Sequence, residues 1–234
     1  MTEKSLAVAP EVEEAILTRR SVRAFTSKPV SKATLTRLFD LAARAASSTN
    51  SQPWHVYAVT GKKRDEISQL ALKAWHSGDR GEQEFQYYPQ EWYEPYLSRR
   101  RQVGFALYDL LGIKKDDKER VDAQQARNLK FFDAPVGLFI TTERRILPQG
   151  IFDCGLFMAT LMIAARGMGL ATCPQLSWTH YHKLLRPLLG IPDDQLLLTG
   201  LALGYEDESA IENSLRTVRA PAEEFCRFEG FSNA

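Results

Sequence analysis

The segment Pro135–Ser177 reads PVGLFITTERRILPQGIFDCGLFMATLMIAARGMGLATCPQLS, and it decides the fold. Its first eight residues form a nearly continuous apolar run, which predicts a buried strand over 135–142. The long apolar run over 152–166 predicts a buried helix that ends at Gly167. A buried strand followed by a buried helix indicates one layered domain of helices and strands rather than a repeat array.

Periodicity on either side of this segment predicts three more helices and two more strands. The helices are expected over 11–19, 31–46 (with Ser31 as N-cap) and 62–75, and the strands over 54–60 and 196–203. The stretch 77–132 is aromatic, charged and interrupted by prolines, so loops and exposed helices are expected there. No linker divides the chain, which predicts a single domain over residues 1–234.

Composition excludes several classes of protein. The chain has 234 residues, 44% of them hydrophobic and 25% charged, and its formal net charge is +1. That charge provides no field to attract nucleic acid or a membrane surface. The longest apolar run, 154–165, is well short of the roughly 20 residues that span a bilayer. The N-terminus has acids where a signal peptide is apolar, so a cytoplasmic protein is expected.

Cysteine and histidine usage predicts neither a metal site nor a disulfide framework. The three cysteines are widely spaced with no CxxC, which fits a reducing cytosol. Cys173 is expected to be a small buried hydrophobe. His180 and His182 form an HxH pair, which is assigned to an exposed helix. Gly167 and Gly169 follow a helix rather than a strand, so a Rossmann dinucleotide site is disfavoured.

Two groups of cationic residues are candidates for anion binding. They are Arg19, Arg20, Ser21 and Arg23 after the first predicted helix, and Arg216 with Arg219 near the end of the chain. A guanidinium fork suits a phosphate because it can bind two oxygens at once. The alternatives are that the first group complements the negative end of a helix dipole and that the second is a scattered surface pair.

Two further segments could contact a ligand. The loop SSTNSQPW (47–54) offers amides and hydroxyls that could pair with the pyrimidine edge of a flavin, or it could be an ordinary turn. The turn GLATCPQLS (169–177) carries backbone donors that could face a hydride-accepting atom, or it could simply connect a helix to a strand.

Five motifs together resemble the FMN-dependent nitroreductases. They are RRSVRAF, SSTNSQPW, GLATCPQLS, LGIPDD and NSLRTVRAP, which span nearly the whole chain in the family's order. The resemblance implies an α+β fold with a central, mostly antiparallel sheet flanked by helices. It also implies an interlocked homodimer with FMN at the interface, and a variable segment over 77–132 on the substrate side.

The resemblance assigns a role to each candidate residue. Arg19 and Arg219 would hold the FMN phosphate, Arg20 and Ser21 the phosphate or the ribityl chain, and Arg23 the N1 and O2 edge of the ring. Ser47, Ser48, Asn50 and Gln52 would come from the second subunit, and Pro174, Gln175 and Leu176 would lie along the flavin. Thr217 stands where some relatives have a lysine, so Arg216 is expected to contribute that charge.

The implied reaction is ping-pong hydride transfer from NADH or NADPH, through flavin N5, to a nitroaromatic or quinone-like acceptor. No residue resembles a nucleophile or general base, since FMN does the redox chemistry. Tyr88, Trp92 and Phe131 are candidates to line the substrate face, with a solvated or dimer-packing role as the alternative. Other activities of related folds also remain open: dehalogenation, heterocycle oxidation, flavin cleavage, or flavin binding without catalysis.

Overall fold

The computed structural model describes residues 10–231, so the prediction that the N-terminus carries no targeting or lipid-anchor motif falls largely outside it. The strands are β1 (Trp54–Thr60), β2 (Val136–Glu143), β3 (Ala171–Gln175) and β4 (Gln195–Gly204). The helices are α1 (Pro10–Thr18), α2 (Lys32–Ala42), α3 (Gly61–His76), α4 (Tyr96–Leu110), α5 (Lys118–Ala126), α6 (Gln149–Gly167), α7 (His182–Leu189) and α8 (Ala222–Phe225). Short 3-10 helices cover Ser48–Asn50, Arg127–Asp133, Arg144–Ile146, Leu176–Tyr181 and Ile211–Ser214.

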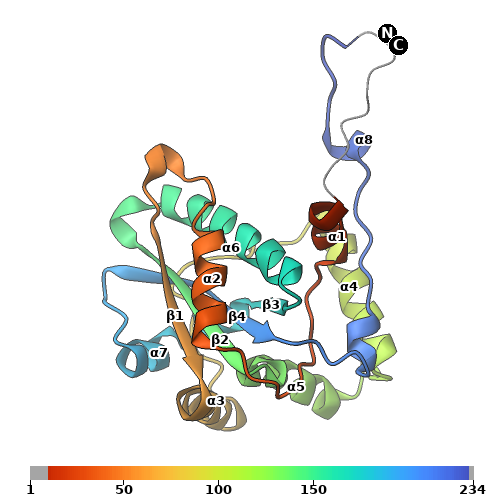
Figure 1. Cartoon of the computed structure of the whole chain (residues 1–234). Coiled ribbons are helices and arrows are strands. Elements are labelled where there is room, and N and C mark those ends of the chain that lie inside the picture. The colour runs from red at the N-terminus through yellow and green to blue at the C-terminus, as the bar shows by residue number, and fades with distance from the viewer. Residues whose placement is uncertain (1–9, 232–234) are drawn as a thin grey trace.

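The four strands form one antiparallel sheet in the order β1-β2-β4-β3. Helices cover both of its faces, with α2 and α6 on one side (Figure 1). The antiparallel sheet flanked by helices confirms the predicted α+β architecture. The predicted strand 54–60 is β1 residue for residue, whereas the second predicted helix ends at Ala42 instead of 46.

One face of the sheet packs against α2 and α6. Alternate residues of β2, Val136 and Leu138, point to this face and contact Phe157 and Leu161 of α6. Trp54, at the start of β1, stacks on Phe157 with ring centroids 4.9 Å apart. The apolar run on α6 therefore builds this half of the core, as predicted, although only part of its surface is buried within one chain.

The opposite face holds an aromatic cluster, and it corrects the prediction for Phe131. Phe131 is fully buried, stacked on Trp178 at 4.7 Å and edge-on to Phe139. A Cβ at Gly137 would lie 2.4 Å from the Phe131 ring, and one at Gly200 2.3 Å from Trp178, so both glycines admit these rings. Because the Phe131 side chain is completely enclosed by other core residues, it cannot contact a substrate.

Two other expectations differ from the structure. Trp178–His182 is not an exposed helix: Trp178, Tyr181 and His182 are buried where a 3-10 helix leads into α7. In addition, the residue with positive φ after α6 is Gly169, at +74°, rather than Gly167. By length and composition α6 could cross a membrane, but core helices pass the same test, and this one packs against the sheet and α2.

The stretch 77–132 contains α4 and α5 between irregular segments, and no residue of α4 is buried. This agrees with the expected loops and exposed helices for most of the stretch, but its last residues, including Leu129, Phe131 and Phe132, are buried in the core. The chain after Ser214 is an extended arm that carries α8 away from the body on the side of α1 (Figure 1). Large apolar side chains of the arm are exposed, including Val218 at 77% and Phe225 at 75%.

Candidate functional site

The candidate site is organised along β3, which the sequence indicated only as a turn. β3 is an edge strand with only one neighbouring strand, β4. This position tolerates Pro174, because a proline in an edge strand can face its missing N–H away from the ladder. The outer edge is joined by the chain that leaves α1: Ser21 pairs in parallel with Thr172, and the Val22 amide donates to the Thr172 carbonyl at 3.0 Å. The first cationic group therefore lies directly beside the GLATCPQLS segment.

Arg19 and Arg219 approach each other at one end of this strand. Burial and the charge of Arg219 lower the pKa of the Arg19 guanidinium. Within residues 10–231 neither arginine forms an ion pair with a carboxylate, and the Arg219 side chain bonds only to Thr217 and the Val218 carbonyl. Two cations without an acidic partner form a local positive site that suits an anion such as phosphate.

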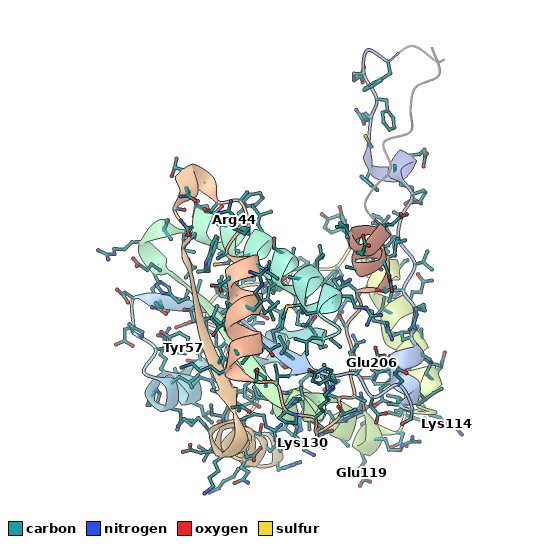
Figure 2. All side chains as sticks on the ribbon, viewed as in Figure 1. Arg44, Tyr57, Lys114, Glu119, Lys130 and Glu206 are labelled. Carbon is teal, nitrogen blue, oxygen red and sulfur yellow. The ribbon has the colours of Figure 1, made fainter. Side chains whose placement is uncertain are left out.

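The other arginines of these groups are already bonded to the protein. Arg20 pairs with Glu206 and donates to the Asn213 carbonyl, and Arg216 donates to the same carbonyl at 2.9 Å. Arg23 bonds through its side chain to the Ser21 carbonyl. Glu206 is labelled in Figure 2, on the side of the molecule nearer the C-terminal arm. Arg20 is therefore neutralised by Glu206, whereas the other four arginines have no carboxylate partner within residues 10–231. Among these four, Arg19 and Arg219 form the pair of uncommitted charges whose mutual repulsion contributes to the lowered pKa of Arg19.

Asn213 joins the two cationic groups, and sequence reasoning missed its role. Its side-chain oxygen accepts from the Arg23 amide at 2.8 Å, and its amide donates to the carbonyls of Ala24 and Asp207. The residue is buried, at 4% exposed. A buried asparagine with every polar group used fixes the distance between the chain's beginning and end. It begins the NSLRTVRAP motif, which was the available signal.

The opposite end of β3 opens into a cavity of about 340 Å³. Pro174, Gln175 and Leu176, the three residues predicted to lie along a flavin, all line it. Further lining comes from β2, α6 and β4 and from the irregular segment before α4: Ile140, Ile151, Cys154, Met158, Leu198, Phe85, Tyr87 and Tyr88. The lining is mainly apolar with a few polar groups, as in sites for small aromatic ligands.

Two buried polar atoms in this cavity wall have no hydrogen-bond partner within residues 10–231. Gln175 is 1% exposed, and its amide nitrogen donates to the Asn128 carbonyl at 2.7 Å, which leaves Oε1 without a hydrogen bond. The Ser177 hydroxyl, further along the same wall, is likewise buried and unpartnered. Buried polar groups are nearly always bonded, so these two atoms indicate a ligand with polar edges.

Of the three predicted substrate-side aromatics, one lines the cavity. Tyr88 lies in its wall, and Trp92 packs behind it with ring centroids 5.6 Å apart. The Arg100 guanidinium lies over the Trp92 ring, 4.9 Å from the ring centroid. Burial raises the pKa of the Tyr88 phenol, so it stays protonated at neutral pH. Phe131 is absent from the wall because it belongs to the core.

The polar loop Ser47–Gln52 lies far from the cationic group within the chain. The buried carboxylate of Asp153, near the start of α6, accepts from the Ser48 amide at 3.2 Å and the Ser51 hydroxyl at 3.3 Å. At the other end of α6, Arg166 donates to the Thr18 hydroxyl, next to Arg19. Thirteen residues of helix separate these anchors by about 20 Å. Figure 2 shows the gap between Arg44, which precedes the loop, and Glu206.

The loop backbone is unusual for its sequence. Thr49, Asn50 and Gln52 all have positive φ, between 49° and 57°, although none is glycine. Such conformations cluster at functional sites because the surrounding structure must impose them. Ser47 accepts from the Gln52 amide, while the side chains of Asn50 and Gln52 are exposed. The exposed side chains of the loop are therefore accessible for contacts outside this chain's own cationic site.

Neither buried cysteine provides a nucleophile. Burial raises the pKa of Cys154 to about 12 and that of Cys173 to about 11, so both are thiols at neutral pH. Cys173 is 3% exposed, which confirms that it is a buried hydrophobe. Among residues 10–231, no group of three or more His, Cys, Asp or Glu is arranged to hold a metal ion.

The two ends of β3 together suit an elongated ligand with an anionic end and a planar end. The four residue steps of β3, from Ala171 to Gln175, separate its two ends by about 13 Å. The arginine pair provides for a phosphate, and the unpartnered Gln175 oxygen can accept from a ring N–H. The residues present therefore fit FMN.

The family model for the nitroreductase family matches residues 16–205. The chain belongs to this family. It is 37% identical to a nitrobenzene nitroreductase of Ectopseudomonas oleovorans, over 94% of this chain and 97% of the relative. It is 36% identical to a 4-nitrobenzoate reductase of Pseudomonas putida, over 94% and 96%.

Solved structures show the same similarity. The FMN and NADPH-dependent nitroreductase NfnB of Sphigopyxis sp. strain HMH superimposes with a TM-score of 0.90 at 40% sequence identity, covering 94% of this chain and 99% of that one. At this identity and coverage the shared fold is that of a nitroreductase. The fold predicted from the five motifs is therefore confirmed.

Proposed function

We propose that this protein is an FMN-dependent oxidoreductase that uses NADPH or NADH to reduce nitroaromatic compounds by a ping-pong mechanism. The observation that carries the proposal is β3, which links an uncommitted arginine pair to an apolar cavity with an unpartnered polar atom. Relatives named as nitrobenzene and 4-nitrobenzoate reductases, each matched over 94% of this chain, support the reaction class. The structural neighbour named for FMN and NADPH dependence supports the cofactors.

When bound, FMN supplies a two-electron carrier that receives hydride at N5 and delivers it to an acceptor. This chain's residues supply binding and orientation. Arg19 and Arg219 hold the phosphate, and Ser21 lies beside them where the chain crosses β3. Arg23 lies close enough to Cys173 of β3 for its positive charge to act there, and this charge would stabilise negative charge on a reduced flavin ring.

The cavity end orients the reacting groups. Pro174 and Leu176 provide flat apolar contact, and Gln175 accepts a ring N–H through its free oxygen. Tyr88, with Trp92 packed behind it, faces the acceptor. Holding donor and acceptor in one water-poor cavity is the protein's main contribution to rate, since its own side chains supply no nucleophile.

The functional form is a homodimer in which the second copy completes each site. About 20 Å of α6 separates the Ser47–Gln52 loop from Arg19, so Ser47, Ser48, Asn50 and Gln52 reach a flavin only from the partner. Exposed apolar side chains on α6, α1 and the C-terminal arm provide the surface such an interface buries. They include Phe152 at 69%, Leu17 at 74% and Phe225 at 75%.

The proposal also includes the domain organisation, the cellular location and the partners of the protein. Residues 1–234 form one domain in which 77–132 is a variable insertion on the substrate side. The protein works in the cytoplasm, where its free cysteines stay reduced, and it acts on small aromatic acceptors without nucleic acid or membrane partners.

A steady-state assay tests the function. The purified protein with FMN should oxidise NADPH or NADH beyond one equivalent per flavin only when an acceptor is added, and should convert nitrobenzene to reduced products seen by chromatography. Varying both substrates should give parallel double-reciprocal lines. Oxidation that ignores nitrobenzene but proceeds with halogenated aromatics would replace this function with another flavin-dependent one.

A further inference from the structure

The aromatic wall of the cavity lies on a segment without regular structure. α3 ends at His76 and α4 begins at Tyr96, and between them Phe85, Tyr87 and Tyr88 line the cavity. A segment with no helix or strand has little backbone bonding to hold it, so side-chain anchors must overcome its conformational entropy. The position of these rings therefore depends on whatever fixes the residues just before them.

The deepest anchor is Glu84, directly before Phe85. Its side chain is 11% exposed, and Oε1 accepts hydrogen bonds from Arg144 Nη2 and Arg186 Nη2, each at 2.5 Å. His182 Nδ1 lies 3.3 Å from the same oxygen. Arg186 in turn donates to the Gln195 carbonyl of β4 at 2.7 Å. One carboxylate thus ties the segment to β4, to α7 and to the turn after β2.

The charges around Glu84 keep it ionised. Burial opposes ionisation of the carboxylate, but the hydrogen bond from Arg186 and the nearby charges of Arg186 and Arg144 outweigh it and lower the pKa of Glu84. Charge-assisted bonds to a half-buried carboxylate are stronger than surface ion pairs. The anchor is therefore fully formed at neutral pH.

Movement at Glu84 would pass to the whole aromatic wall, because the rings contact one another in series. The ring centroids of Phe85 and Tyr87 are 6.1 Å apart, and those of Tyr87 and Tyr88 are 5.1 Å apart. Phe85 also packs among Ile140, Cys154 and Leu198, at the inner wall of the cavity. A carboxylate outside the cavity is in this way connected to the surface that faces an acceptor.

We propose that Glu84 is a positioning residue for acceptor selection: its bonds to Arg144 and Arg186 hold the Phe85–Tyr88 wall against the cavity. The proposal rests on the proposed function for its catalytic consequence. The wall belongs to the cavity end of β3, whereas the uncommitted arginines lie at the other end. Losing the anchor should therefore weaken binding of the aromatic acceptor and leave flavin retention unchanged.

The test compares Glu84→Gln with Glu82→Gln. Glu82 lies two residues earlier on the same segment but is exposed and pairs with Lys183, so it controls for loss of a negative charge nearby. In Glu84→Gln, KM for nitrobenzene should rise about tenfold, with kcat within about twofold and flavin content unchanged. Hydrogen exchange of residues 79–95 should become faster in Glu84→Gln alone, with or without flavin.

Two results would overturn the proposal. One is a Glu84→Gln protein whose KM and hydrogen exchange match those of the Glu82→Gln control. The other is a Glu84→Gln protein in which kcat and flavin content fall together with the rise in KM, because a general folding defect produces that combination. Should Glu84→Gln not fold, Arg144→Gln removes only the outermost partner, at 38% side-chain exposure, and should show the same KM effect in smaller size.

The same experiment separates failure of this inference from failure of the proposed function. A wild-type protein that retains FMN but oxidises no NADPH with nitrobenzene contradicts the function. Hydrogen exchange of the 79–95 segment needs no catalysis. It would still show whether Glu84 holds the aromatic wall in place.

Discussion

Arg19 and Arg219 come from opposite ends of the chain, yet they are close enough that the charge of Arg219 adds to burial in lowering the pKa of Arg19. Asn213 holds the two segments together by bonding both the Arg23 amide and the Ala24 carbonyl. A folded protein places two uncompensated cations together at a cost, which an anion between them removes. Their proximity is therefore the structural basis of the proposed phosphate site.

Replacing both arginines should release the cofactor. In Arg19→Ala/Arg219→Ala, each lost charge-assisted bond removes about 1.5 to 3 kcal/mol of FMN binding. The fraction of flavin retained after gel filtration should fall sharply. Arg101→Ala, an exposed arginine on α4, is the matched control and should keep its flavin. A double variant with full flavin content would disprove the phosphate assignment.

Gly137→Ala should destabilise the fold by about 1 to 3 kcal/mol, because the new Cβ would lie 2.4 Å from the Phe131 ring in a fully packed core. Urea unfolding followed by tryptophan fluorescence measures the effect. Gly104→Ala, in α4, has nothing within 4 Å and should instead be neutral or slightly stabilising. Equal unfolding midpoints for the two variants would contradict the packing described for Phe131.

Phe152→Glu should weaken the proposed dimer. Phe152 is 69% exposed on α6 in a single chain, and a charge there opposes burial against a second copy. We expect the dimer dissociation constant to rise by about two orders of magnitude. Sedimentation velocity at several concentrations measures it, with flavin loss expected alongside. Phe105→Glu, at 54% exposure on α4, is the control. An unchanged dimer would place the interface elsewhere.

Stability should fall as the pH decreases below about 6.5, the ordinary histidine pKa. Burial lowers the pKa of His182 in the folded state, so on acidification the unfolded chain binds this proton before the folded protein does. The free energy of unfolding therefore decreases as the pH falls. The lowered pKa of Glu84 acts in the same direction at lower pH, because protonation loses its bonds. Glu82, Lys183 and Arg186 also face His182.

Thermal unfolding at pH 8 and pH 5.5 measures this dependence. His182→Gln should reduce the loss of Tm on acidification, while His76→Gln, an exposed histidine at the end of α3, should not. Identical pH dependence in wild type and His182→Gln would show that other groups control acid sensitivity.

Local pattern was sufficient where a structural element is long or strongly periodic. The strand over 54–60 has an alternating pattern and is present residue for residue. The helix over 152–166 has a continuous apolar run and is present with small extensions, as Gln149–Gly167. The five-residue strand β3 was missed because Pro174 argues against a strand, and only its place at the sheet edge permits one. Its chemistry was still indicated by the GLATCPQLS motif.

Long-range relationships could not be predicted from local pattern. Phe131 resembled other aromatics of its segment, and only the side-chain-free surface of Gly137 on β2 explains its burial. The HxH pair looked exposed because its neighbours are polar, yet His182 is buried against Glu84. Asp153 and Glu84 each act through residues distant in sequence, so nothing adjacent to them marks their roles.

The most direct test of the central claim is the visible absorbance of the FMN-loaded protein during anaerobic addition of NADPH and then nitrobenzene. We expect the flavin bands to bleach with about one equivalent of NADPH and to return when nitrobenzene is added. A protein that binds no FMN would contradict this expectation, and so would a protein whose bound flavin stays oxidised after NADPH is added. The arginine pair and the cavity along β3 would then serve another ligand.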